Sequence, residues 1–266
     1  TTSDLARFMV GHDVRTEKLG SGAQRGEERL SLRGLTQEPH FRNIDLTAYA
    51  GEVLGVTGLL GDGRSELFSA VFGAEPMSAG EIRLCGQAVR ITSTRQAKRL
   101  GIAYVPRNRK ENGIIKDMSI LENGTIVSWP DLMRRGLLNH EKQRAEFNEE
   151  KAALHIKMGG ENDSITSLSG GNQQKVVLAK WLSREPKVLI LDNPTQGVDV
   201  GAKEEIYDII LKLAKEGVSV IVLSSEAQEI IRVCDRALVM YHGEIVGEVS
   251  GETMTEHEIM RLATGG

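Results

Sequence analysis

The sequence is poor in aromatic residues and cysteine, and it has no long apolar run. Aromatic side chains make up 4% of the 266 residues, which leaves few candidates for stacking on a nucleobase. The two cysteines, Cys85 and Cys234, are far apart in sequence. We expect two buried thiols in a reducing compartment rather than a disulfide or a metal pair. No apolar run approaches the roughly 18–20 residues that span a bilayer, so any action at a membrane would need another protein to hold the chain there.

The net charge and the first residues argue against a nucleic-acid-binding protein and a secreted protein. The formal net charge of -4 gives no electrostatic footprint for nucleic acid, and we expect no nucleic-acid partner. Residues 1–4 have neither a basic flank nor an apolar segment, so secretion is not expected. A hydrophobic fraction of 40% and a charged fraction of 26% are typical of an ordinary globular protein, and a length of 266 residues fits one large domain or two small ones.

Short unbroken apolar runs alternate with helical patterns through most of the chain. Strands that are apolar on both faces need helices on both sides, so this pattern predicts an α/β fold with a largely parallel sheet. Two further segments, 81–91 and 241–249, resemble antiparallel hairpins at an edge. We expect buried strands at 53–56, 102–105, 188–191, 218–223 and 237–240, and helices that include 66–72, 173–182 and 203–215.

Two segments depart from this alternation. Residues 1–28 contain a possible short helix and then a glycine-rich polar stretch that is typical of a linker, which suggests a fragment of a longer protein. Residues 119–166 contain no buried strand, and 141–157 are strongly helical and charged, so we expect a helical insertion there. The predicted divisions are 1–28, 29–118, 119–167, 168–250 and 251–266, the last being a C-terminal helix.

A glycine-rich loop follows the first buried strand. Residues 58–65 match the pattern G-x-x-x-x-G-[basic]-[ST], with arginine where lysine is usual. The glycines let backbone N–H groups close around phosphate oxygens, and the helix N-terminus adds a partial positive charge. The alternative is an ordinary strand-to-helix turn. We favour phosphate binding and expect nucleotide contacts from Gly58, Leu59, Gly61, Asp62, Gly63, Arg64, Ser65 and Glu66.

Asp192 ends a second apolar strand at 188–192. A carboxylate there suits magnesium, which bridges nucleotide phosphates and takes an anionic partner from the protein. Alone, such an aspartate is more often a turn or helix-cap residue. Together with the glycine loop it predicts Mg²⁺ and ATP as ligands, with Ser65 and Asp192 as the metal-binding residues.

Residues 168–175, Leu-Ser-Gly-Gly-Asn-Gln-Gln-Lys, place Ser169, Gly170 and Gly171 at the start of a helix. A serine-capped helix is the plain alternative. The stretch resembles the signature motif of ABC ATPases, and its order between the glycine loop and Asp192 is also that of the family. The resemblance implies that these three residues act in trans, closing on the γ-phosphate held by the opposing cassette.

Further stretches narrow the resemblance to the C-terminal cassette of monosaccharide-importer ATPases of the ribose, galactose and xylose type. These are residues 63–65, 170–175, 197–203 and 224–226, and residues 7–11 resemble the tail of a preceding N-terminal cassette. The resemblance implies a RecA-like P-loop core with an antiparallel β-subdomain and an inserted α-helical subdomain. It also implies three partners: the N-terminal cassette of the same subunit, a membrane permease, and indirectly a periplasmic or extracellular sugar-binding protein. The expected location is the cytoplasmic face of the bacterial inner membrane, as a peripheral subunit.

Four positions depart from a complete hydrolytic site. Arg64 replaces the loop lysine, which is usual for second cassettes of this kind. Asn193 replaces the glutamate that polarises attacking water, and an amide cannot act as a general base. Ser225 stands where the switch histidine is expected, and Arg107 with Asn108 stands where the family has glutamine or Glu-Asp.

We therefore expect a nucleotide-binding half of a sugar-importer ATPase whose own hydrolysis is weak or absent. The alternative is a nucleotide-sensing scaffold that never hydrolyses ATP. A soluble ABC ATPase of DNA repair or translation is disfavoured, because the chain has neither a long coiled coil nor a basic arm. The nearest aromatic candidate for stacking on adenine is Phe41, although a core role for it is favoured. The sequence does not identify the sugar.

Overall fold

The computed structural model describes residues 19–20, 22 and 24–266, and it forms two compact units. The short helix expected within residues 1–18, and the likeness of residues 7–11 to a cassette tail, lie outside the described residues. Among the described residues, the larger unit comprises residues up to 104 together with 187–193 and 210–266, and the smaller unit comprises 105–186 and 194–209.

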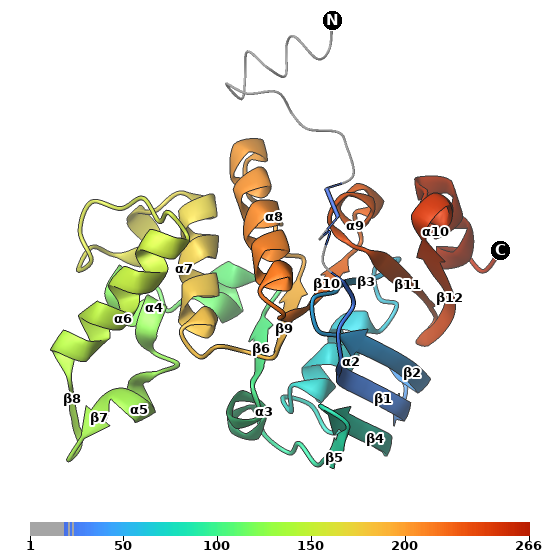
Figure 1. The fold of residues 1–266 in the computed structure, drawn as a ribbon, viewed down its shortest axis with the longest axis horizontal. Coiled ribbons are helices and arrows are strands. Elements are labelled where there is room, and N and C mark those ends of the chain that lie inside the picture. The colour runs from blue at the N-terminus through green and yellow to red at the C-terminus, as the bar shows by residue number, and fades with distance from the viewer. Residues whose placement is uncertain (1–18, 21, 23) are drawn as a thin grey trace, which may run out of the picture. The chain divides into compact units, whose positions relative to one another are not determined.

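A six-stranded sheet forms the centre of the larger unit, in the order β12-β11-β3-β10-β9-β6 (Figure 1). Strands β11, β3, β10 and β9 run parallel, and β12 pairs antiparallel with β11. This confirms the predicted strands and the edge hairpin. The bounds are β3 Val53–Gly58, β6 Ile102–Val105, β9 Val188–Asp192, β10 Ser219–Ser224, β11 Arg236–Tyr241 and β12 Glu244–Ser250.

A second, antiparallel sheet has the order β2-β1-β4-β5. The hairpin β4 (Ala79–Leu84) and β5 (Gln87–Val89) confirms the prediction for 81–91. Strands β1 (Glu28–Gln37) and β2 (Phe41–Tyr49) were not predicted, because charged residues interrupt their apolar positions and mask the alternation. The helices of this unit are α2 Arg64–Val71, α3 Thr94–Leu100, α9 Ala227–Val233, α10 Glu256–Ala263 and the end of α8 Val200–Lys215.

The smaller unit is mainly helical. In Figure 1, α4, α6 and α7 run side by side, and each contacts the other two. Gly124 allows the close packing of α4 on α6, because a Cβ at that position would lie 2.5 Å from the Phe147 ring. The elements are a π-helical turn Arg109–Gly113, α4 Ile120–Thr125, α5 Trp129–Leu132, β7 Met133–Arg134, β8 Leu137–Leu138, α6 His140–Ala153, a 3₁₀ turn Ile165–Ser167, α7 Gly170–Leu182 and the start of α8.

Helix α6 is shorter than predicted at its C-terminal end. The prediction of helix to residue 157 was wrong because the chain leaves the helix at Leu154, and His155 takes a left-handed conformation with φ 51°. Helix α4 begins at a capping box, in which Ser119 and Glu122 satisfy each other's backbone N–H groups. No helix of the described residues is both long and apolar enough to cross a membrane.

The two thiols differ in exposure. Cys234 is buried as predicted, but Cys85 is exposed, so the expectation of two buried thiols was wrong for it. Cys85 lies in the tight turn between β4 and β5 with φ 49°, where a side chain projects into solvent. Phe41, by contrast, is 1% exposed within β2, which agrees with the core role.

Candidate nucleotide-binding site

The glycine loop, residues 58–65, connects β3 to α2. A Cβ at Gly58 would lie 2.2 Å from Asp62 Oδ2 and 2.4 Å from the Met240 carbonyl oxygen. Gly63 has φ 94°, and a Cβ there would lie 2.2 Å from the His40 carbonyl oxygen. No larger residue fits at either position, so these glycines let the loop turn tightly before the helix.

Helix α2 opens without a side-chain cap in the described part of the chain, because its N-cap is Gly63. The first N–H groups of a helix have no partner inside it, and the helix N-terminus carries a partial positive charge. Ser65 and Glu66 in this first turn are half-buried, while Leu59 and Gly61 are exposed. The loop therefore presents backbone donors suited to an anion.

Arg64 and Asp62 form a buried ion pair inside this loop. Arg64 Nη1 lies 2.5 Å from Asp62 Oδ2, and it also donates to the carbonyl oxygens of Gly58 at 3.2 Å and Leu59 at 3.1 Å. The two side chains are 3% and 4% exposed. Burial raises the pKa of the Asp62 carboxyl, and the nearby Arg64 partly offsets this rise. The Arg64 Nε atom is buried without a hydrogen-bond partner among the described residues.

Asp192 lies at the end of β9, and the strand register fixes its position. Asp192 pairs in register with Leu223 of β10, and the next residue of β10, Ser224, pairs in register with Thr57 of β3. Because β3, β10 and β9 are parallel, the glycine loop and Asp192 both follow the carboxyl edge of the sheet, where ligands bind in open α/β folds.

Both carboxylate oxygens of Asp192 accept hydrogen bonds. Tyr104 OH donates to Oδ2 at 3.1 Å, and Asn193 Nδ2 donates to Oδ1 at 2.7 Å. Burial raises the pKa of Tyr104 well above its ordinary value, and the Asp192 carboxylate raises it further. Tyr104 therefore stays protonated and acts as a donor. Its role could not be read from the sequence, because a tyrosine in an apolar strand has the same pattern as a core residue.

Asn193 and Ser225 stand at the positions expected for glutamate and histidine. The Asn193 backbone N–H donates to the Leu223 carbonyl oxygen at 2.7 Å, and its φ is 47°, a left-handed conformation that asparagine tolerates. The Asn193 side chain is 8% exposed and turned toward Asp192. Ser225 follows β10 and is exposed, whereas Ser224 is buried.

The residues at this edge fit a magnesium-bound polyphosphate. The loop offers backbone N–H groups, a guanidinium whose Nε has no hydrogen-bond partner within the described part of the chain, and two glycines, Gly58 and Gly63, that leave no room for a Cβ. Ser65 and Asp192 would supply the hard oxygen ligands that magnesium prefers beside phosphate oxygens. The Asp62 carboxylate is the one group within the loop that disfavours an anion.

The predicted signature residues lie in the smaller unit, at the start of α7. Ser169 is the N-cap, and its hydroxyl accepts from the Asn172 side-chain Nδ2 at 3.0 Å and backbone N at 3.4 Å. A Cβ at Gly171 would lie 2.4 Å from the Ala202 Cβ, and one at Gly170 would lie 2.6 Å from Arg109 Nη2. Packing thus requires glycine at position 171, a side chain at Gly170 would displace the Arg109 guanidinium, and Ser169 is exposed at an open helix end.

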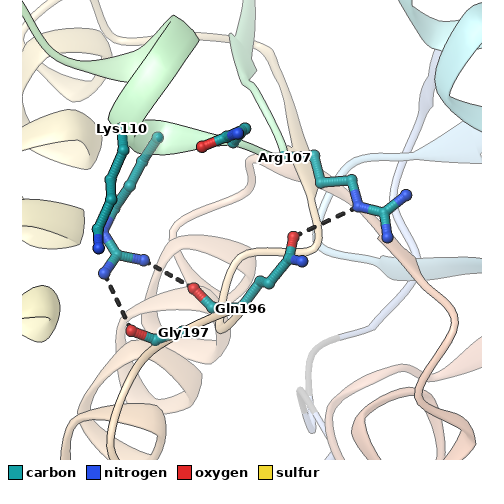
Figure 2. Close-up of a pocket in the computed structure, with 6 residues that line it drawn as sticks. Arg107, Lys110, Gln196 and Gly197 are labelled. Carbon is teal, nitrogen blue, oxygen red and sulfur yellow. Dashed lines mark hydrogen bonds between the residues drawn. The ribbon is translucent and has the colours of Figure 1, made fainter.

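A basic pocket of about 470 Å³ also lies in the smaller unit (Figure 2). Arg109 projects from the π-helical turn and donates to the carbonyl oxygens of Gln196 at 2.7 Å and Gly197 at 3.0 Å. Arg107 Nε donates to Gln196 Oε1 at 3.3 Å. Burial lowers the pKa of Arg109. The contacts of Arg109 with Gln196 and Gly197 were missed in the sequence, where Arg109 is one charge in a run of basic residues.

The fold and the glycine loop define the class: a P-loop nucleotide-binding domain of the RecA-like type with an antiparallel β-subdomain and a helical subdomain. Similar solved structures carry the same fold. A nucleotide-free ATP-binding cassette from an ABC transporter superposes with a TM-score of 0.75 at 19% identity, over 87% of this chain and 95% of that one. A dimeric bacterial ABC transporter cassette gives 0.69 at 23% identity, over 83% and 98%.

The family profile described as "ABC transporter" matches residues 41–196. This chain belongs to the ABC transporter family. It is 42% identical over 268 residues to the ribose import ATP-binding protein RbsA 2 of Rhizobium meliloti, covering 100% of this chain and 52% of that protein. It is 41% identical over 263 residues to the galactose/methyl galactoside import ATP-binding protein MglA of Treponema pallidum, covering 98% and 53%. The chain thus spans about half the length of the curated relatives it matches.

Proposed function

We propose that this chain is the second, C-terminal cassette of the ATPase subunit of a bacterial sugar importer. In this proposal it binds Mg-ATP at residues 58–65 and supplies Ser169, Gly170 and Gly171 to the opposing cassette. The partners are an N-terminal cassette of the same subunit, a membrane permease and, indirectly, a sugar-binding protein. The subunit would lie at the cytoplasmic face of the membrane. The likeness to ribose and galactose import proteins supports the assignment.

The observation that carries the proposal is a contrast between two parts of this chain. One is its own ATP site, which includes Asp192 and Asn193, and the other is the helix start at Ser169, which would complete the site of the opposing cassette. Asn193 donates a hydrogen bond to Asp192 where a general base is needed. An amide cannot take a proton from water, so a factor of about 10²–10⁴ in rate is lost from the chain's own site. Ser225 offers no imidazole to hold the γ-phosphate. The helix start at Ser169 has no such defect.

Ser169 is well placed to bind a phosphate oxygen. Its side chain is exposed, and it caps a helix whose first N–H groups point out of the helix end. Gly170 and Gly171 keep this corner free of side chains. The hydroxyl and the backbone donors would stabilise negative charge on the γ-phosphate as water attacks it.

The test is a pair of substitutions measured in the complete importer. Ser169→Arg is expected to remove most ATP hydrolysis, because a bulky cation replaces the hydroxyl at the helix start. Ser167→Arg is the matched control, since Ser167 is also exposed two residues earlier, and its hydroxyl donates to the Ser164 carbonyl oxygen at 2.7 Å within its own turn. Equal activity of the two variants would contradict the proposal.

The second candidate is a scaffold that binds nucleotide and never supports hydrolysis. The Asn193–Asp192 hydrogen bond favours the scaffold, because an amide in this place leaves the chain's own ATP site without a general base. Calorimetric titration with Mg-ATP followed by a steady-state assay of the importer separates the two. ATP binding together with full activity of Ser169→Arg would support the scaffold.

A further inference from the structure

The phosphate loop already contains an anion of its own. The Asp62 side chain is buried within the loop, 4% exposed, and its Oδ1 accepts a hydrogen bond from the Arg64 backbone N–H at 3.1 Å. Its Oδ2 accepts from Arg64 Nη1 at 2.5 Å. One carboxylate therefore engages both a loop amide and the loop cation, which are the two kinds of donor that a bound phosphate needs.

The position of the carboxylate is as informative as its bonds. Asp62 Oδ2 lies where a Cβ of Gly58 would be only 2.2 Å away, so the carboxylate lies against the bare backbone at the first glycine of the loop. Arg64 Nη1 is held at the same place by the carbonyl oxygens of Gly58 and Leu59. The pair fills the space inside the turn, and neither charged group reaches solvent.

We propose that Asp62 is an internal phosphate substitute that competes with the phosphates of a nucleotide for the loop. This inference rests on the proposed function, namely that residues 58–65 bind Mg-ATP. An incoming phosphate must separate Asp62 from Arg64, and like charges disfavour its approach while the carboxylate stays in place. Asp62 therefore sets the affinity of the site for phosphate-containing ligands without touching the adenosine portion.

Two other roles for Asp62 predict that its removal weakens nucleotide binding, which is the opposite of what competition predicts. If the carboxylate only held the loop in shape, its removal would weaken nucleotide binding. If it were a magnesium ligand, an amide in its place would weaken binding in the presence of the metal. Competition alone predicts that removing the negative charge strengthens binding.

The experiment compares the binding of Mg-ATP, pyrophosphate and adenosine to the full chain by calorimetry. Asp62→Ala and Asp62→Asn are expected to bind Mg-ATP and pyrophosphate roughly 10- to 100-fold more tightly than the unchanged chain, the range expected for one charge-assisted hydrogen bond. Adenosine binding should not change. Asp62→Asn keeps the size of the side chain and guards against a collapsed loop in the alanine variant.

The matched control is Asp45→Ala. Asp45 is also an aspartate of the larger unit whose Oδ1 accepts a backbone N–H, from Gly34 at 2.8 Å, but it lies on the exposed face of β2. Its loss removes the same charge and should leave affinity unchanged. Equal or weaker binding of Mg-ATP by both Asp62 variants, with the unchanged chain binding well, overturns the competition and leaves the proposed function standing. No binding of Mg-ATP by the unchanged chain or by either folded variant overturns both.

Discussion

Replacing Asn193 by glutamate would supply the residue that we expect at this position from the resemblance to ABC ATPases, and the contacts of Asn193 predict a loss of stability. The Asn193 amide donates to Asp192 Oδ1 at 2.7 Å, and the backbone is left-handed with φ 47°. A glutamate cannot donate this hydrogen bond, and it places a second negative charge beside Asp192. It also tolerates the left-handed conformation less well than asparagine.

The magnitudes follow from these contacts. Loss of a hydrogen bond to a charged acceptor costs about 1.5–3 kcal/mol, and the backbone conformation adds about 1 kcal/mol. We therefore expect Asn193→Glu to lower the free energy of unfolding by about 2.5–4 kcal/mol without magnesium. Asn193→Ala is the matched control, since it loses the hydrogen bond without adding charge. Mg-ATP should recover part of the loss for the glutamate variant and less for alanine.

The assay is urea unfolding followed by circular dichroism, paired with steady-state ATP hydrolysis in the complete importer. Hydrolysis should rise little, because Ser225 remains where a histidine is needed. A rise into the range of about 10²–10⁴-fold, which is what a general base contributes, would refute the reasoning that both positions limit the chain's own site. Unchanged stability of Asn193→Glu would refute the structural part.

Two further predictions concern the smaller unit, where tryptophan fluorescence can follow unfolding because both tryptophans lie there. Gly171→Ala should lower the free energy of unfolding by about 1–2 kcal/mol, because the new Cβ would overlap the Ala202 Cβ. A second change, Ala202→Gly, should restore the stability. If the double variant is no more stable than Gly171→Ala, the packing argument is contradicted. Burial lowers the pKa of Lys180 from 10.5 to about 8, so the unfolded chain binds the Lys180 proton more tightly than the folded chain does. The free energy of unfolding should therefore increase as the pH rises from about 8 toward 10.5. Lys180→Met should flatten that increase, and an equally steep increase in the variant would contradict it.

Much of the sheet could be predicted from the sequence, because strands such as β9 and β10 are apolar at all but their end positions and buried throughout, and such runs occur where a strand is covered on both sides. The second sheet was only half predicted. Strand β1 alternates imperfectly, with register shifts against β2, and this hides its period of two residues. Helix α6 was predicted too long because its charged composition continues past the point where His155 turns the backbone out of the helix.

The candidate site, like the fold, could be predicted from the sequence only in part. Sequence spacing predicted the strand before the glycine loop, the strand that ends at Asp192 and the helix that starts after Ser169, and the structure confirms these local features. The contacts of Tyr104 with Asp192 and of Arg109 with Gln196 join residues more than eighty positions apart, and no local pattern encodes them. The pairing of Asp62 with Arg64 is local, but the burial of both groups depends on how the loop closes, which spacing alone does not specify.

The most direct test of the account is the fate of ATP trapped in the complete importer during a single turnover. If this chain binds ATP without hydrolysing it while Ser169 completes the opposing site, the trapped complex should hold ATP and ADP in equal amounts. Complete conversion of the trapped nucleotide to ADP would contradict the account, because it would require an active base in the half that carries Asn193.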